Sequence, residues 1–417
     1  MIAHVERWLP AGEGRARAAG RRLPLPELDP WLLLVTLALC GLGLIVVYTS
    51  SQALAYSYYG NPAYFVERQA LWLGLGLAAL VVCAKVDYHR WSRLAPWLAL
   101  GTVGLLLAVL VPHIGVEVQG ARRWIRLGPM ELQPSVLAQF LTVIGGAVWL
   151  ARLGATIRDF RDGVMQFGWR LAVLAGLVLL EKDLGSAVVL GMVGLGLLLL
   201  AGARYRHLLG IGAAAAVAVL LLIKAEPYRS ERLLSYLNPF AHPLGSGFQA
   251  VQALYSLGVG GLTGTGLGSA VPTSQALPEA HTDFIFAIIG EELGLLGTLA
   301  VLLLFAAFAY RGLRAARLAQ DRLGTLLAGA ITMWIVGQAL INVGGVTDTI
   351  PSTGVPLTFI SFGGSSLALS LAATGILLNI SARQRRVGTG NARAHHRGRD
   401  GGTLHPSHRG LGGAAAD

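Results

Sequence analysis

The chain has 417 residues, of which 54% are apolar and only 13% charged, and its mean hydropathy is +0.60. Because soluble domains carry about 25% charged residues, this composition excludes a soluble enzyme and favours several membrane-spanning helices. A net charge of +11 would suggest nucleic acid as the partner of a soluble protein, but here it first raises the question of membrane orientation.

Ten apolar runs approach the length of about 20 residues that a membrane-spanning helix needs. The run at 168–180 is the shortest and could also be an amphipathic core helix, but an even number of spans favours counting it. We therefore expect an all-α integral membrane protein with about ten transmembrane helices. The runs lie at 31–51, 69–86, 94–112, 135–151, 168–180, 184–202, 207–224, 284–309, 323–344 and 363–382.

Two polar tails flank the predicted membrane domain, which covers residues 31–386. Residues 1–30 are rich in Arg, Pro and Gly and do not form a cleavable signal peptide, so the run that starts at Trp31 acts as the first span. Residues 387–417 contain mostly Gly, Arg and His without apolar periodicity. We expect this second tail to be disordered.

The distribution of basic residues predicts the orientation. Ten spans place both termini on one side, and if that side is the cytoplasm, 25 of the 33 Lys and Arg residues lie inside and eight outside. Most of the charge is then an orientation signal, and nucleic acid is not needed to explain it. Cys40 and Cys83 both lie in apolar runs, which excludes a disulfide framework and a cysteine metal site.

Three arginines, Arg122, Arg123 and Arg126, lie in an outer loop, against the usual bias of basic residues toward the cytoplasm. The planar guanidinium group suits phosphate oxygens, so one interpretation is a bound anion such as a lipid diphosphate. The other interpretation is anchoring to outer-leaflet phospholipid, or pairing with Glu117 and Glu131.

The outer loop at 225–283 is too long for a plain connector, and such loops are usually functional. It ends in His281-Thr282-Asp283, where the eighth span begins. An acid at a membrane boundary is a functional candidate, and a partly desolvated carboxylate can act as a general base. Alternatively, Thr282 or Asp283 is an N-cap that satisfies the free amide groups of the helix.

Other acids lie at or inside spans. Glu291 and Glu292 are about 12 Å further along the eighth helix. They form either a polar relay or a hydrogen-bonded contact between helices, and we favour the contact. Glu181 and Asp183 end another span and form either a further polar wall or a satisfied turn. The glycines of 258–268 lack the strand–helix context of a nucleotide fingerprint and indicate either a flexible loop or close backbone packing of re-entrant turns.

Together these outer motifs resemble the SEDS (shape, elongation, division and sporulation) family, typified by FtsW and RodA. The resemblance covers roughly residues 31–386. In its two C-terminal segments, 277–294 and 359–367, the sequence is closer to the FtsW branch than to RodA. The matching segments are Gly120–Ile125 (GARRWI), Gln133–Ser135 (QPS), Leu277–Gly294 (LPEAHTDFIFAIIGEELG) and Phe359–Leu367 (FISFGGSSL).

The resemblance implies a peptidoglycan glycosyltransferase of the bacterial cytoplasmic membrane. It would polymerise lipid II, an undecaprenyl-diphosphate disaccharide-pentapeptide, on the outer face, together with a class B penicillin-binding transpeptidase and other proteins of the divisome or elongasome. Asp283 matches the catalytic aspartate of the family and would deprotonate the 4-hydroxyl of the acceptor sugar. The diphosphate would then leave with inversion, beside a divalent cation such as Mg²⁺ or Mn²⁺ if one is used.

We expect the substrate to lie among the polar residues of the outer loops. The arginines would hold the diphosphate charge, which is our own inference and not a role taken from the family. The residues expected to contact substrate are Arg122, Arg123, Arg126, Glu181, Asp183, Glu279, His281, Ser365 and Ser366.

The chain departs from the family pattern at several positions near this face. The usual Glu-Leu-Ala-Lys after Gln-Pro-Ser is replaced by Val136 to Gln139, which removes two charges. Pro272-Thr273 replaces the Gln-Lys of many division members, and Lys182 and Asp348 replace a proline and a glycine. These changes would alter the polar contacts of the site without touching the block around Asp283.

Two other classes of protein fit some of the same features. A lipid II flippase predicts polar residues through the whole membrane depth and on both faces, whereas the cytoplasmic loops here are generically basic. A non-catalytic scaffold that activates a transpeptidase needs no general base, whereas the Asp283 block is intact. The glycosyltransferase is therefore the interpretation that we favour.

Overall fold

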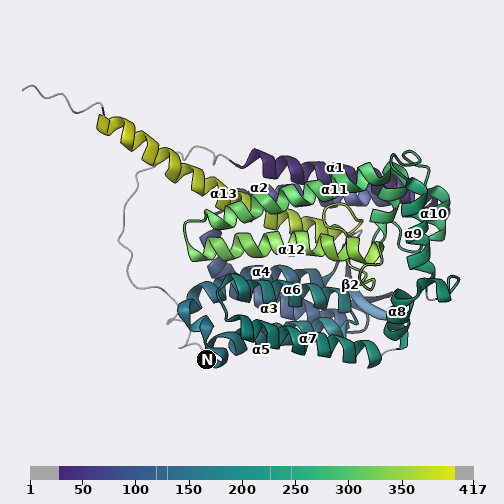
Figure 1. The fold of residues 1–417 in the computed structure, drawn as a ribbon, viewed down its shortest axis with the longest axis horizontal. Helices are drawn as coiled ribbons and strands as arrows, with labels where there is room; N and C mark the ends of the chain where they lie inside the picture. Colours follow the sequence, from purple (N-terminus) through teal and green to yellow (C-terminus); the bar gives the residue numbers. More distant parts are fainter. Residues whose placement is uncertain (1–27, 119, 129, 226, 246, 400–417) are drawn as a thin grey trace, which may run out of the picture.

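The computed structural model describes residues 28–118, 120–128, 130–225, 227–245 and 247–399. Most of its helices run roughly parallel in one bundle (Figure 1). The elements are α1 Pro30–Tyr59, α2 Tyr64–Lys85, η2 Tyr88–Arg90, α3 Trp91–Leu110, β1 Gly115–Val118, β2 Ala121–Leu127, β3 Met130–Leu132, α4 Pro134–Leu153, η3 Gly154–Arg158, η4 Phe160–Val164, α5 Met165–Leu180, α6 Leu184–Leu200, α7 Tyr205–Ala225, α8 Pro227–Leu237, η5 Pro239–Ala241, α9 Phe248–Gly260, α10 Val271–Ala276, α11 Ile285–Arg317, α12 Arg322–Val346 and α13 Gly364–Arg399.

Nine segments in the described part of the chain are long and apolar enough to cross a membrane, and α6 is a shorter apolar helix of 17 residues. The prediction of a mostly helical, multi-span membrane protein is confirmed. The shortest span is α6, however, and not the run at 168–180, because the span that contains α5 already starts at Phe160. Asp183 caps the start of α6, and Gly202, with φ 88°, follows its end.

The two ends of the membrane domain lie on one side of the bundle. The start of α1 and the far end of α13 lie at one end, whereas β2, α8, α9 and α10 lie at the other (Figure 1). This arrangement agrees with an even number of spans. The outer segment 225–283 is not a plain loop, because α8, α9 and α10 fold within it.

The helix α13 continues to Arg399, so residues 387–399 are helical where we expected a disordered tail. The prediction was wrong for this stretch, which follows a long apolar helix and contains no proline to end it. Just before this stretch, Arg383 forms an ion pair with Asp87 at 2.6 Å. The rest of the predicted tail, and most of the predicted N-terminal tail, lie outside the described residues.

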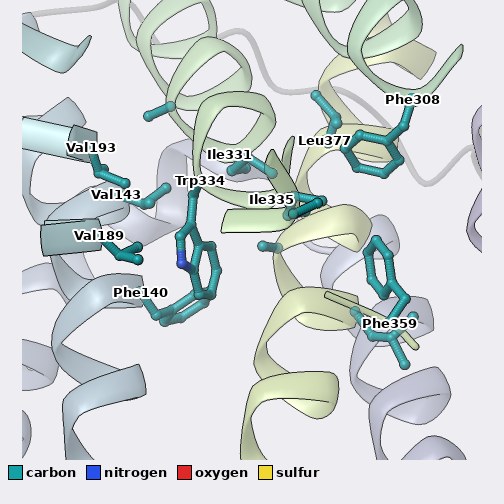
Figure 2. Close-up of a cluster of buried hydrophobic side chains, with 14 of the residues drawn as sticks. Phe140, Val143, Val189, Val193, Phe308, Ile331, Trp334, Ile335, Phe359 and Leu377 are labelled. Atoms are coloured by element: carbon teal, nitrogen blue, oxygen red, sulfur yellow. The ribbon is translucent and has the colours of Figure 1, made fainter. Parts of the chain in front are cut away.

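The core lies where α4, α12 and α13 meet. In the most apolar stretch of α13, 89% of the residues are buried. In the corresponding stretch of α7, no residue is buried. Figure 2 shows Trp334 in one buried cluster with Phe140 and the valines at 143, 189 and 193. The indole N–H of Trp334 donates to Oε1 of Gln139 at 2.8 Å, which satisfies both buried groups. Gln139, a departure from the family pattern, thus has a defined partner.

A three-stranded antiparallel sheet in the order β1-β2-β3 lies between α3 and α4. Gly115 pairs with Ile125, which also pairs with Leu132. The all-α expectation missed this sheet because its strands are short and lie in a loop between two spans. Along β2 the side chains alternate between the two faces, with Ala121 and Ile125 buried and Arg126 exposed.

Candidate active site

Asp283 lies half-buried at the mouth of α11. The N-cap residue of α11 is Phe284, whose side chain cannot accept a hydrogen bond from the helix. Thr282 instead directs its hydroxyl to the main-chain carbonyl of Glu279 at 3.1 Å and to its carboxylate at 2.9 Å. The interpretation of Thr282 or Asp283 as the helix N-cap is therefore wrong, because the helix begins later than either residue.

The main chain of 281–283 is fixed at three consecutive carbonyl groups. The first accepts a hydrogen bond from the main-chain N–H of Phe362 at 2.9 Å. The second accepts from the hydroxyl of Ser361, and the third from the side-chain amide of Asn342 at 2.7 Å. Because all three donors come from α12 or the loop that follows it, the position of Asp283 depends on residues about 60 to 80 positions away in the chain.

Gln69 of α2 fixes the loop that supplies two of these donors. Its buried side chain donates to the carbonyl of Ser361 at 3.0 Å and accepts from the N–H of Gly363 at 3.3 Å. No sequence motif pointed to Gln69, since a lone glutamine near the start of an apolar run belongs to none. Its role follows only from the long-range contact.

The imidazole of His281 lies between two aromatic rings. Its ring centroid is 4.5 Å from that of Phe65 and 5.7 Å from that of Phe362. Burial lowers the pKa of His281, while the nearby carboxylate of Glu279 opposes this shift. The imidazole is therefore neutral at neutral pH and packs as an aromatic group beside the candidate base.

Glu279 shapes the turn before α11 with its main chain. Its φ of 57° lies in the left-handed region, and its carbonyl accepts from the N–H groups of Thr282, Asp283 and Phe284. Its side chain is exposed on the outer face. The carboxylate of Glu279 thus lies within reach of a ligand while its main chain sets the turn.

Two of the three outer arginines form ion pairs across the sheet. Arg122 lies 3.1 Å from the carboxylate of Glu117, and Arg126 lies 3.3 Å from that of Glu131. These are the pairs that the alternative interpretation predicted. The side chains of Arg126, Glu117 and Glu131 are about half exposed or more, so each pair contributes about 0–1 kcal/mol to stability.

Arg123 points in the opposite direction from its two neighbours. It donates from Nε to the carbonyl of Glu181 at 3.3 Å and from a terminal nitrogen to the carbonyl of Lys182 at 2.6 Å. These bonds tie β2 to the turn between α5 and α6. Of the three arginines, this one has a structural role that the sequence did not distinguish.

Glu181 and Asp183 differ in their surroundings. Asp183 caps α6 through the N–H of Ser186 at 3.0 Å, and it accepts from the side chains of Gln133 and Ser135 at 3.0 and 2.9 Å. It is therefore a satisfied turn residue, one of the two interpretations given above. Glu181 is 1% exposed, and its carboxylate has no hydrogen-bond partner in the described part of the chain.

Burial raises the pKa of Glu181 to about 9, and the charge of Asp183 adds to this shift, against the opposing effect of Arg123. The carboxyl group is therefore protonated and neutral at neutral pH, as a buried acid without a partner must be. It is not placed to hold the charge of a diphosphate.

The serines of the last motif face the bundle. Both are buried, and Ser365 accepts a hydrogen bond from the N–H of Gln133 at 3.3 Å. Ser365 therefore joins the start of α13 to the start of α4. The structure does not place Ser365 or Ser366 on an open surface where a substrate would meet them.

Glu292 links three elements, as the favoured interpretation predicted. It accepts from the hydroxyl of Thr49 in α1 at 2.9 Å and from the N–H of Gly268 at 3.0 Å. Its neighbour Glu291 accepts from the hydroxyl of Thr273 at 3.0 Å. These neutral and main-chain donors fix the first turns of α11. Thr273, another departure from the family pattern, is thus a partner of Glu291.

The glycine-rich segment packs its main chain directly against α11. A Cβ on Gly260 would lie 1.8 Å from the carbonyl oxygen of Gly290, and one on Gly264 would lie 2.2 Å from that of Glu292. Gly294, with φ 66°, interrupts the helical conformation at the same contact. Of the two alternatives for this segment, a flexible loop or close backbone packing, the structure shows the packing.

No three His, Cys, Asp or Glu residues among those described are arranged to hold a metal ion. Mg²⁺ usually binds one or two carboxylates together with substrate phosphate and water. Asp283 and Glu279 are the carboxylates of the α11 mouth that could take part in such a site. The divalent cation stays a prediction.

The comparisons with known proteins decide the family. The cell cycle protein family of FtsW, RodA and SpoVE matches residues 30–386. The chain belongs to this family. Its relatives include proteins named "probable peptidoglycan glycosyltransferase FtsW" from Geobacter metallireducens, at 39% identity over 87% of this chain and 98% of the relative, and from Nitrosococcus halophilus, at 42% over 88% and 95%.

Solved structures of the family share the fold. A chain from a structure described as "Structural coordination of polymerization and crosslinking by a peptidoglycan synthase complex" matches with a TM-score of 0.71 and 29% identity, over 86% of this chain and 98% of that one. RodA of Thermus thermophilus matches with a TM-score of 0.62 and 26% identity over the same shares. This member of the FtsW/RodA/SpoVE family is therefore a multi-pass membrane protein.

Proposed function

We propose that this chain is a peptidoglycan glycosyltransferase that polymerises lipid II on the outer face of the bacterial cytoplasmic membrane, for cell division or elongation. The names of its FtsW relatives support the activity. The observation that carries the proposal is the position of Asp283. It lies half-buried at the outer mouth of α11, on a main chain fixed by Phe362, Ser361 and Asn342.

In the reaction, the oxygen of the acceptor sugar's 4-hydroxyl attacks the anomeric carbon of the donor, and Asp283 accepts the proton of that hydroxyl. The new C–O bond forms as the bond to the diphosphate breaks, so the anomeric configuration inverts. The electron pair leaves with the lipid diphosphate. The fixed main chain of 281–283 holds the base in the orientation that the transfer needs.

The diphosphate meets basic groups on the outer sheet. Arg122 and Arg126 are the accessible arginines, and each can exchange its carboxylate partner for phosphate oxygens, which a guanidinium group can bind in a bidentate contact. Arg123 holds β2 in place by its hydrogen bonds to the turn at Glu181 and Lys182. Substrate binding by Glu181, Ser365 and Ser366 is not part of the proposal, because these side chains are buried.

The partner is a class B penicillin-binding transpeptidase, which crosslinks the strands that this chain makes. The structural neighbour belongs to a peptidoglycan synthase complex that coordinates polymerisation and crosslinking, and this supports the pairing. The two activities then act on the same nascent strand at the outer membrane surface.

The activity is tested with the purified chain in lipid nanodiscs, alone and with its transpeptidase, supplied with fluorescently labelled lipid II. We expect glycan strands on a gel from the wild type and none from Asp283→Ala. Movement of lipid II across vesicle membranes without strand formation would contradict the proposal and favour a flippase. Strands that persist in Asp283→Ala would contradict the role of Asp283 as base.

A further inference from the structure

Tyrosines are concentrated at the outer hairpin between α1 and α2. Four of the 11 tyrosines of the chain lie between positions 56 and 64. Three of them, Tyr56, Tyr58 and Tyr59, have exposed fractions of 67%, 77% and 52%. Aromatic residues at a membrane surface are often interfacial anchors, so exposure alone does not indicate a site.

The rings at this hairpin are held in place by contacts with each other and with Arg68, which a membrane anchor does not require. Tyr59 stacks on Tyr64 with a centroid separation of 3.6 Å and an interplanar angle of 6°. The guanidinium carbon of Arg68 lies 3.5 Å from the centroid of Tyr64, a cation–π contact. A rigid ring loses little conformational entropy when a ligand binds to it.

The same rings continue into the candidate active site. Phe65 meets Tyr59 edge to face at 5.9 Å and Tyr64 at 5.3 Å. It also contacts the ring of His281 at 4.5 Å, two positions before Asp283. A continuous row of aromatic rings thus leads from the exposed surface of Tyr59 to the mouth of α11.

Polar groups border this aromatic row. The side-chain amide of Asn61 donates to the carboxylate of Glu67 at 3.3 Å, in an exposed position. Arg68 adds a positive charge beside Tyr64. A pyranose ring has an apolar face of axial C–H groups and a rim of hydroxyls and amides, so it matches a flat aromatic surface with donors and acceptors at its edge.

We infer that Tyr59, Tyr64 and Phe65, with Asn61, Glu67 and Arg68 at their edge, form a binding subsite for sugars of the growing glycan strand. The inference rests on the proposed function, because it assumes that the strand is made at Asp283. Sugars that have left the mouth of α11 stack on the exposed face of Tyr59 and keep the strand attached between additions.

The subsite is tested with the full-length chain in nanodiscs, as wild type, Tyr59→Ser and Tyr59→Phe. Tyr205→Ser is the matched control, since Tyr205 is 75% exposed at the start of α7, at the other end of the bundle. One assay measures binding of a lipid-free, peptide-free tetrasaccharide of alternating N-acetylglucosamine and N-acetylmuramic acid by calorimetry. The other measures the length of strands made from lipid II, and melting temperatures confirm folding.

We expect Tyr59→Ser to weaken tetrasaccharide binding about threefold to tenfold and to shorten the strands. Tyr59→Phe retains the ring and stays within about twofold of the wild type, and Tyr205→Ser matches the wild type. Equal binding and equal strand lengths in wild type and a folded Tyr59→Ser would overturn the subsite and leave an interfacial anchor. So would a wild type that makes strands but does not bind the tetrasaccharide. A wild type that binds the tetrasaccharide through Tyr59 but makes no strands would instead overturn the proposed function.

Discussion

The side-chain amide of Asn342 donates to the main-chain carbonyl of Asp283 at 2.7 Å and to that of Val355 at 2.8 Å. One buried amide of α12 therefore joins the candidate base to the loop before α13. Removing it leaves two carbonyl groups without this donor, and an unpaired buried group costs about 1–3 kcal/mol.

We expect Asn342→Ala to lower the rate of strand synthesis at least about tenfold, because even a small displacement of a catalytic group is costly. Gln338→Ala is the matched control. Gln338 lies one turn earlier on α12 and donates to the carbonyl of Pro356 at 3.1 Å, not to Asp283. Equal rates in the two variants at equal melting temperatures would contradict a positioning role for Asn342.

The raised pKa of Glu181 predicts that the stability of the folded protein depends on pH. This pKa is raised from 4.5 to about 9 by burial, so the folded protein binds a proton that the unfolded chain loses above about pH 4.5. This contribution to stability is full below about pH 4.5 and is lost as the pH rises toward 9.

The Glu181→Gln variant keeps a neutral side chain of similar shape at every pH. We expect its melting temperature, relative to the wild type, to rise between about pH 5 and 9 and then to level off. Glu131→Gln, at an exposed carboxylate on the same face, should show no such trend. A constant difference between wild type and Glu181→Gln across this range would show that Glu181 is charged in the folded protein.

The three arginines should separate into two classes. Arg122→Ala and Arg126→Ala break exposed ion pairs and should change stability by less than about 1 kcal/mol. Both should raise the KM for lipid II, because each removes a proposed contact to the diphosphate. Arg123→Ala leaves the carbonyl groups of Glu181 and Lys182 without their donor and should lower the melting temperature more. Three variants with equal melting temperatures and an unchanged KM would contradict this division.

The helices followed from the sequence more completely than the site did. Apolar runs predicted the number of spans because a membrane-spanning helix requires about 20 consecutive apolar residues, a property that can be recognised without knowledge of tertiary contacts. The sheet at 115–132 was missed because its strands are short and its register depends on pairing between segments. The alternation along β2, which places Arg123 on the face opposite Arg122 and Arg126, can be recognised only once the strand is known.

The motifs identified Asp283 but not the residues that fix it. Gln69, Ser361 and Asn342 reach the segment 281–283, or the loop beside it, across about 60 to 290 residues of sequence, and no local pattern specifies such contacts. The helix-cap interpretation failed for a related reason. The turn at Glu279 forms its own hydrogen bonds, and it moves the start of α11 beyond Asp283.

Gly264 tests the packing of the outer segment on α11. It has φ 82°, and a Cβ there would lie 2.2 Å from the carbonyl oxygen of Glu292. Gly264→Ala should destabilise the protein by about 2 kcal/mol or more, which lowers the melting temperature. Gly258→Ala is the control, because nothing lies within 4 Å of its Cβ position, and it should be neutral or slightly stabilising in α9. Equal melting temperatures for the two variants would contradict the packing.

Asp283 is, in the mechanism proposed above, the base that deprotonates the acceptor hydroxyl. Its most direct test compares initial rates of lipid II polymerisation by the wild type, Asp283→Asn and Asp348→Asn in the same nanodiscs, with matched melting temperatures. We expect a loss of at least about a hundredfold for Asp283→Asn, which keeps the shape but cannot accept the proton. Asp348→Asn should retain most activity, because Asp348 is a half-buried acid after α12 that has no part in the proposed site, and its φ of 52° suits an asparagine. Polymerisation by Asp283→Asn at the wild-type rate would contradict this role.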